Sequence, residues 1–287
     1  MPLPMPPVVR QADLVQQLSA RGLRPGDALM LHGALSSLGR VEGGASAVVE
    51  ALLSLLGPTG TLVVPTLTDV AQPFSPDTSP STVGRLTEVV RQWPGAVRSR
   101  HPTHAVAAIG ARAHDLTAGH EATLPCGPDS PYGRLGGLRG WVLLLGVDQD
   151  RNTTWHTAET MVDVPYLQTL TVQVRQPDGS IENMALPKSP WGHRAFIGLD
   201  RPLREAGLLQ MGRVGQAVAR LMRADEMLAW GCARLRDDPA AFLCTKPRCV
   251  FCQWARAMVR GDAALVDWAD RTRRWGCLDP HCEVCVV

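Results

Sequence analysis

The sequence lacks the features that place a protein at a membrane or on a nucleic acid. It contains no apolar run of about eighteen residues, the length that a membrane-spanning helix needs. Its start, residues 1–10, is rich in proline and has no apolar stretch typical of a signal peptide. The net charge is only +2 and the arginines are spread out, so there is no basic stripe. These absences predict a cytoplasmic protein that binds neither membranes nor nucleic acids, with residues 1–10 as a flexible arm.

Apolar segments with alternating strand and helix character fill residues 11–243. Residues 28–32 and 61–65 are expected to be buried strands on either side of a helix that ends at Gly57, a βαβ unit typical of a parallel sheet. Further helices are expected over 11–21 and 84–92, and the strongest buried strand over 141–147. Residues 170–175 and 181–186 predict a hairpin turned by Pro177-Asp178-Gly179. From about residue 201 the pattern is helical. We expect a three-layer α/β domain.

His156 lies at a predicted junction between a strand and a helix. It follows the buried strand 141–147, after residues 152–154 (Asn-Thr-Thr), which can cap a helix. This is the edge where open α/β sheets bind ligands. The positive helix terminus disfavours an imidazolium, and a neutral ring can take a proton from an attacking amine. Glu159 lies on the same helix face and can orient the ring or hold a cationic substrate. The alternative is a histidine that only packs beside Trp155.

Two loops carry groups that suit a nucleotide-bearing cofactor. Residues 98–104, RSRHPTH, bring two arginines and two histidines together, and guanidinium groups suit phosphate oxygens. Residues 32–39, HGALSSLG, turn at the end of the first strand, where backbone donors can cradle a phosphate or a pantetheine amide. Taken alone, the first segment is better explained as a solvated basic loop, and the second is a weak signal because glycine-rich turns are common.

The ordered blocks of the chain resemble the aminoglycoside 3-N-acetyltransferases. They read LMLHGALSSLGRVEGGASAVVEALLSLLGPTGTLVVPT, RSRHPTHAVAAIG, SPYGRL, VLLLGVDQDRNTTWHTAE and DPAAFLCTKPRCVFCQWAR. The resemblance covers about residues 11–257 and implies the antibiotic N-acetyltransferase fold, with direct transfer of an acetyl group from acetyl-CoA to an amine. It implies that His156 is the catalytic base, that Glu159 acts with it, and that backbone donors of the turn at 32–39 face the developing oxyanion.

The resemblance also assigns binding residues. Acetyl-CoA is expected against His32, Gly33, Ala34, Leu35, Ser36, Ser37, Arg98, Ser99 and His104. Asp69 and Glu159 are expected to contact the substrate amines.

The chain departs from the family pattern at several of these places. Gly33-Ala34 stands where the family usually has two serines, and Ala105 where a serine is common. No Asp or Glu occurs between Asn183 and Leu199, where relatives carry a catalytic Asp, so His156 lacks its usual partner or Glu159 replaces it. A polycationic substrate also needs several carboxylates. These departures leave a second hypothesis: a degenerate relative that binds CoA or a partner protein without catalysis.

Six of the eight cysteines lie in residues 244–287, which we expect to form a metal-binding region. Two copies of a C-x-x-P-x-C-x-x-C pattern carry them: Cys244, Cys249 and Cys252, then Cys277, Cys282 and Cys285. The spacing is typical of structural zinc knuckles. Both copies can share one four-thiolate site, or each can take a fourth ligand, with His193 and His281 as candidates. An iron–sulfur cluster and free thiols are the less favoured alternatives. Cys126 and Cys232 are expected to be buried hydrophobic residues, and a homodimer is left open.

Overall fold

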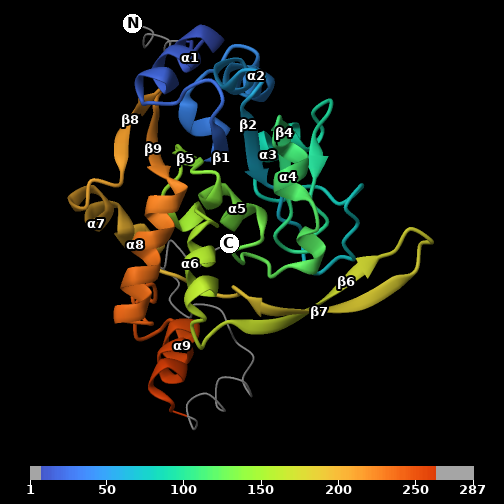
Figure 1. Cartoon of the computed structure of the whole chain (residues 1–287), viewed down its shortest axis with the longest axis vertical. Coiled ribbons are helices and arrows are strands. Elements are labelled where there is room, and N and C mark those ends of the chain that lie inside the picture. The colour runs from blue at the N-terminus through green and yellow to red at the C-terminus, as the bar shows by residue number, and fades with distance from the viewer. Residues whose placement is uncertain (1–7, 263–287) are drawn as a thin grey trace, which may run out of the picture.

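The computed structural model describes residues 8–262, so residues 1–7 and 263–287 lie outside the described part. A seven-stranded sheet forms the centre of the molecule (Figure 1). In spatial order its strands are β3 (Val97–Arg98), β4 (Val106–Gly110), β2 (Thr61–Pro65), β1 (Ala28–Gly33), β5 (Trp141–Leu145), β9 (Ala217–Arg223) and β8 (Gln210–Val214). The helices are α1 (Gln11–Ala20), α2 (Gly44–Leu56), α3 (Arg85–Arg91), α4 (Ala113–Thr117), α5 (Pro131–Gly137), α6 (Trp155–Val162), α7 (Asp200–Glu205), α8 (Ala224–Asp237) and α9 (Val250–Arg260).

Helices cover both faces of this sheet, which confirms the predicted three layers. Successive side chains of a strand point to opposite faces, and each face has its own apolar core. Leu143 and Leu145 of β5 pack with side chains of α1, α2 and α3. Val142 and Leu144 pack on the other face with α4, α5, α6 and α8. Because β1, β2 and β5 are buried on both faces, their sequences are continuous apolar runs rather than alternating ones.

The sheet is mixed, which corrects the expectation of a parallel sheet. Within it, only the pairs β1–β2 and β1–β5 are parallel. The pairs β2–β4, β3–β4, β5–β9 and β8–β9 are antiparallel. The βαβ unit of β1, α2 and β2 was predicted correctly. The strands toward both edges of the sheet, β3 and β4 on one side and β8 and β9 on the other, were not predicted to pair antiparallel.

The expectation of helices from residue 201 onward was wrong over residues 210–223, which form the β8–β9 hairpin. Ala217, Ala219 and Leu221 are buried while Val218 is exposed, the two-residue period of a β-strand. Gly215 turns the hairpin with φ +56°. Tertiary packing decides this segment, because Ala, Arg, Leu and Met also suit a helix.

The parallel strands bring three loops to one edge of the sheet. Since β2, β1 and β5 are adjacent and run in the same direction, their carboxyl ends lie together. The loop after β2, the short 3₁₀ turn after β1 (η1, Leu35–Leu38) and the connection from β5 to α6 therefore meet there. Such a meeting point is the usual ligand site of an open α/β sheet.

The predicted hairpin is present as β6 (Gln168–Arg175) and β7 (Ile181–Ser189), and it projects from the body (Figure 1). Backbone bonds of Phe74 to Gln173 and Arg175 join the hairpin to the loop after β2. Residues 244–262 pack onto the same core as the sheet, and α9 lies beyond α6 and α8 in Figure 1. Of the predicted flexible arm, residues 8–10 are described: Val9 is buried and donates its N–H to Arg40 O.

We expect Leu144→Ala to test the core between β5 and the helices α6 and α8. Leu144 is fully buried, so the substitution should lower the free energy of unfolding by about 2–5 kcal/mol through lost burial and a cavity. Met161→Ala on the exposed side of α6 is the control and should change it by less than about 0.5 kcal/mol. Urea denaturation measures both, and equal values for the two variants would contradict this account of the core.

Candidate active site

A cavity of about 1190 Å³ opens at the edge where the three parallel strands end. Its wall includes residues of the loop after β2 (Leu67, Thr68 and Val70), the turn after β1 (Ala34, Leu35 and Ser36) and the connection after β5 (Val147, Asp150 and Asn152). His156 and His104 reach the same cavity. The topology of the sheet therefore assembles the site from segments that are far apart in sequence.

His156 is held at the start of α6 by its neighbours. Thr154 is the N-cap residue, and Asn152 Oδ1 accepts a bond from its backbone N–H at 3.2 Å. Trp155 is fully buried and donates its indole N–H to Gln149 Oε1 at 2.8 Å. The Phe196 ring meets the imidazole edge-on, with centroids 5.2 Å apart. These contacts fix the first turn of the helix, so His156 projects into the cavity.

Glu159 orients the imidazole of His156. The Nδ1 atom of His156 lies 2.7 Å from Glu159 Oε2. A carboxylate accepts hydrogen bonds and cannot donate them, so Nδ1 carries the proton. In the neutral ring this leaves Nε2 with a free lone pair. Of the two expectations, a His156 without a partner and a Glu159 in place of the missing aspartate, this contact fits the second, and the lone pair of Nε2 can accept a proton.

A buried arginine keeps Glu159 ionised. Glu159 is fully buried, and burial alone would raise the pKa of its carboxyl. The charge of Arg194 and the hydrogen bond from His156 outweigh this effect and lower the pKa. Arg194 Nε lies 2.5 Å from Glu159 Oε1, and Tyr166 also donates its hydroxyl to that oxygen at 3.3 Å. The segment that lacks the expected aspartate therefore supplies a cation instead.

Most of the predicted acetyl-CoA residues of the turn after β1 line the cavity. They are His32, Gly33, Ala34, Leu35 and Ser36. Ser37 instead donates to Ala34 O at 2.6 Å and lines a smaller neighbouring pocket. Burial lowers the pKa of His32 to about 3, so its ring is neutral at pH 7.

The RSRHPTH segment contributes one of its three predicted residues to the cavity, His104. Burial lowers the pKa of His104 to about 3, so this ring is also neutral. Arg98 and Ser99 lie outside the lining. Arg98 donates to the carbonyls of Ser79 and Thr66 and so holds the loop after β2. Ser99 is buried against His120, with Oγ and Nδ1 2.9 Å apart.

The charged residues of the cavity were missed by sequence reasoning. Three arginines line it, Arg40, Arg85 and Arg151, against one carboxylate, Asp150. A second pocket of about 290 Å³ reaches His156 beside Asp148 and Asp150. Asp148, Asp150 and Arg151 precede His156 in the connection after β5. Their position just before His156 could have identified them as residues of the site. Nothing in the sequence around Arg85 marks it as part of a site.

Asp69, the predicted substrate contact, lies outside the residues that line either pocket. Its carboxylate accepts the backbone N–H of Ala71 at 2.9 Å, a local turn contact. Its neighbours Thr68 and Val70 do line the main cavity. Burial and the nearby charge of Asp148 raise the pKa of Asp150, which accepts the N–H of Ile197. Apart from Glu159, the acidic groups that share a pocket with His156 thus follow β5 rather than β2.

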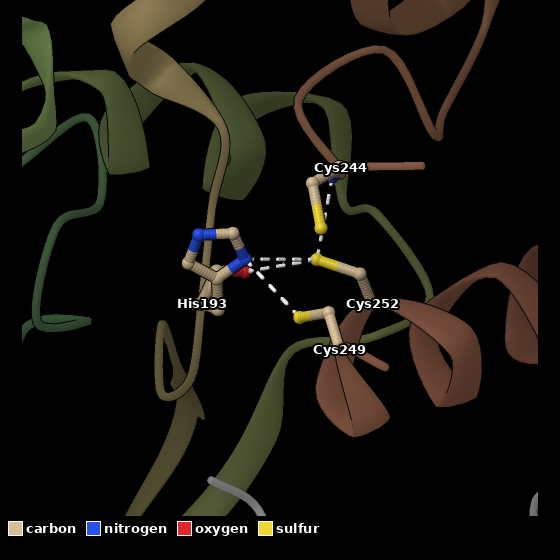
Figure 2. Close-up of side chains that lie close together, drawn as sticks. All are labelled: His193, Cys244, Cys249 and Cys252. Carbon is tan, nitrogen blue, oxygen red and sulfur yellow. Dashed lines mark hydrogen bonds between the residues drawn. The ribbon is translucent and has the colours of Figure 1, made fainter. Parts of the chain in front are cut away.

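Three of the predicted metal ligands gather with His193 in one cluster. Figure 2 shows His193 facing Cys244, Cys249 and Cys252, and their ligand atoms lie within 4.8 Å of one another. His193 Nδ1 is 3.3 Å from the sulfurs of both Cys249 and Cys252. This is the arrangement predicted with His193 as the fourth ligand. Cys277, Cys282 and Cys285, with His281, lie outside the described residues.

The remaining two cysteines are buried in the core, as predicted. Cys126 is fully buried and Cys232 is nearly so. Neither belongs to the cluster around His193.

The sequence and the fold of this chain match one enzyme family. The family model Aminoglycoside 3-N-acetyltransferase matches residues 30–236. Aminoglycoside N(3)-acetyltransferase IV of Salmonella sp is 38% identical over 237 residues, which cover 82% of this chain and 90% of the relative. The chain belongs to the aminoglycoside 3-N-acetyltransferase family. A second relative, aminoglycoside N(3)-acetyltransferase VII of Streptomyces paromomycinus, is 35% identical and covers 80% of this chain and 92% of its own length.

Solved structures of aminoglycoside acetyltransferases share the fold. Apo AAC(3)-IVa superposes with a TM-score of 0.81 at 37% identity, covering 89% of this chain and all of that one. A histidine-to-alanine variant of AAC(3)-IVa in complex with a gentamicin gives a TM-score of 0.78 at 37% identity, covering 84% and 94%. AAC-IIIb bound to CoASH gives 0.73 at 28% identity, covering 84% and 100%.

Membership in this family makes the chain an acyltransferase, which confirms the prediction. Within residues 8–262, every helix is too short or too polar to cross a lipid bilayer.

We expect Glu159→Gln to lower the free energy of unfolding by about 3–5 kcal/mol at pH 7, because it leaves Arg194 buried without a counter-charge. The pKa of Glu159 is lower in the folded than in the unfolded chain. The stability that ionised Glu159 contributes is therefore complete above the pKa that Glu159 has in the unfolded chain. It is lost as the pH falls through the lower pKa that Glu159 has in the folded chain. Urea unfolding at pH 7 and at successively lower pH should measure the difference in free energy of unfolding between the wild type and Glu159→Gln. This difference should become smaller only at acidic pH.

The control for this comparison is Glu182→Gln, an exposed carboxylate on β7. It should leave the stability within about 0.5 kcal/mol of the wild type. Equal stabilities of Glu159→Gln and the wild type at pH 7 would mean that the buried ion pair contributes nothing.

Proposed function

We propose that this protein transfers the acetyl group of acetyl-CoA to an amino group of an aminoglycoside, with His156 as the general base. The observation that carries the proposal is the hydrogen bond between His156 Nδ1 and Glu159, which leaves Nε2 free at the cavity. The gentamicin complex of AAC(3)-IVa and the CoASH complex of AAC-IIIb support the two substrates by analogy.

The charges of the main cavity suit the nucleotide end of acetyl-CoA. Arg40, Arg85 and Arg151 surround it, and guanidinium groups pair with phosphate oxygens. Leu35, Leu67 and Val70 provide an apolar wall that suits the pantetheine chain. The thioester would then lie beside the turn after β1. The first N–H groups of this 3₁₀ turn, those of Leu35 and Ser36, have no acceptor inside the turn and can bind the thioester oxygen.

The reaction follows from these positions. The unprotonated substrate amine attacks the thioester carbonyl carbon while His156 Nε2 takes a proton from the nitrogen. The negative charge that forms on the carbonyl oxygen faces the backbone donors of the turn. The carbon–sulfur bond then breaks, and the CoA thiolate takes the proton from Nε2. Acetyl-CoA and the amine thus give the N-acetylated amine and CoA, and the enzyme returns to its starting state.

The second pocket beside His156 suits the acceptor. Asp148 and Asp150 line it beside Arg151 and Arg194, and the two carboxylates can pair with ammonium groups of the substrate that do not react. Asp150 also lines the main cavity, so the two spaces adjoin at His156. An acceptor placed there would reach the thioester from the side opposite to the nucleotide.

We also propose that Cys244, Cys249, Cys252 and His193 hold one structural Zn²⁺. Thiolates about 2.3 Å from a tetrahedral zinc lie roughly 3.8 Å apart, and the ligand atoms here are all within 4.8 Å of one another. Hydrogen bonds from Cys252 and His193 lower the pKa of Cys249, which favours the thiolate form that binds a metal. The four protein ligands would close the site, which is typical of structural zinc.

His156→Ala should lower kcat by about 10²- to 10⁴-fold, because no other group can take the amine proton at that position. The assay follows acetylated aminoglycoside and CoA by chromatography, with a panel of aminoglycosides and simple amines. Affinity for CoA should be retained. A wild-type enzyme that releases no CoA with any amine, or a His156→Ala variant as fast as the wild type, would contradict the proposed function.

Native mass spectrometry should find zinc bound to the full-length protein. Cys249→Ser should lose one ion per chain, since three ligands hold the metal far more weakly than four. Cys232→Ser, which alters a buried cysteine outside the cluster, should keep the full complement. Purified wild-type protein that takes up no zinc would refute the metal proposal.

A further inference from the structure

The cysteine cluster and the catalytic base are joined by one side chain, Arg194. It follows the cluster residue His193 directly in sequence and bonds to Glu159, which in turn holds His156. No other charged side chain within residues 8–262 forms an ion pair with Glu159. The position of the base therefore depends on how firmly Arg194 is held.

Arg194 packs against two aromatic rings, one of which belongs to α9 beside the cluster. Its guanidinium carbon lies 4.8 Å from the centre of the Phe251 ring and 4.9 Å from that of Tyr166. Phe251 stands between the cluster residues Cys249 and Cys252 at the start of α9. Only 2% of the Arg194 side chain is exposed. The guanidinium thus lies against two aromatic rings and is almost wholly removed from solvent.

The backbone before Arg194 is pressed against α9. Gly192 has φ +92°, and a Cβ atom there would lie 2.2 Å from the Phe251 ring. On the other side of His193, Arg194 Nη1 donates to the carbonyls of Trp191 and His193 at 3.3 Å and 3.1 Å. The thiol of Cys252 also approaches His193 O at 3.6 Å. Any movement of His193 away from the cysteines would carry Arg194 with it.

We propose that Arg194 is the positioning residue of the catalytic dyad and that the metal-loaded cluster holds it in place. The cluster then acts on catalysis without touching either substrate. With the ion bound, His193 and α9 are joined and Arg194 fixes Glu159, so the free Nε2 of His156 faces the thioester. Without the ion, Arg194 loses its fixed position, Glu159 loses its partner, and the imidazole no longer keeps one orientation.

This inference rests on the proposed function, because a base needs positioning only if the reaction occurs. The test therefore includes a measurement that needs no turnover. ¹⁵N NMR of histidine-labelled protein without substrates reports which ring nitrogen of His156 carries the proton. The His156 signals are assigned from their loss in His156→Ala.

The variants are Arg194→Met, which removes the charge, and Arg194→Lys, which keeps it without the planar group. Arg91→Met is the matched control, since it breaks another arginine–carboxylate pair, with Glu88, away from the dyad and the cluster. We expect Arg194→Met to lower kcat by about 10- to 100-fold with little change in the KM for acetyl-CoA. The single Nδ1–H pattern of His156 should be lost, Arg194→Lys should recover part of both properties, and Arg91→Met should match the wild type.

The metal arm uses the zinc-loaded wild type before and after removal of the ion with a chelator. Removal should alter the His156 signals as Arg194→Met does, and adding zinc back should restore them. An unchanged kcat and unchanged His156 signals in Arg194→Met would overturn the role of Arg194. If Arg194→Met fails to fold, the test uses Arg194→Lys and the zinc-free wild type. The role of Arg194 would be overturned if Arg194→Lys had the kcat and the His156 signals of the wild type and zinc removal also left the His156 signals unchanged.

Two outcomes separate the parts of the proposal. Unchanged His156 signals after zinc removal, with altered signals in Arg194→Met, would overturn the link to the cluster. A wild type that shows the expected His156 signals and their dependence on Arg194 and zinc but acetylates no amine would support the positioning role, while the proposed function would fail.

Discussion

The arrangement of the site depends on the buried carboxylate of Glu159. It accepts a hydrogen bond from His156 on one oxygen and pairs with Arg194 on the other. A carboxylate without access to water needs such partners, because burial disfavours its charged form. Its position fixes which nitrogen of the imidazole is free, and so decides where a proton can be accepted. Residues that contact Glu159 therefore also influence the orientation of His156.

This constraint ties together parts of the chain that are remote in sequence. His156 and Glu159 belong to α6, Arg194 follows the projecting hairpin, and Tyr166, whose hydroxyl also bonds to Glu159, precedes it. The hydroxyl of Tyr166 bonds in addition to Pro239 O, near the cysteine region. The site is thus a junction between the sheet domain and the segment after residue 238, and the cysteine cluster adjoins it rather than standing apart.

Charged side chains line both spaces of the site. Arg40, Arg85, Arg151 and Asp150 line the larger cavity, and Asp148 and Asp150 line the smaller pocket together with Arg151 and Arg194. His156 borders both. A phosphate-bearing donor and a cationic acceptor would then each meet side chains of opposite charge, and the reacting atoms would meet at the imidazole.

Many of the central elements could be predicted from the sequence, because their signals are local. The apolar runs of β1, β2 and β5 and the turn at Pro177-Asp178-Gly179 identify their own structures. The pairing of His156 with Glu159 follows from helical spacing alone. The hairpin of β8 and β9 could not be recognised in this way, since its alternation is short and its residues suit a helix equally well.

What the sequence determined by itself was the family pattern, the position of His156 at a strand-to-helix junction, and the spacing of the cysteines. The tertiary structure decided which residues meet: that Arg194 pairs with Glu159 behind His156, that His193 joins the first three cysteines, and that Arg98 and Ser99 lie outside the cavity. The physical reason is that helical spacing and turn chemistry act over a few residues. Ion pairs, stacking and metal-ligand geometry depend on how distant segments pack, and no local pattern records that packing.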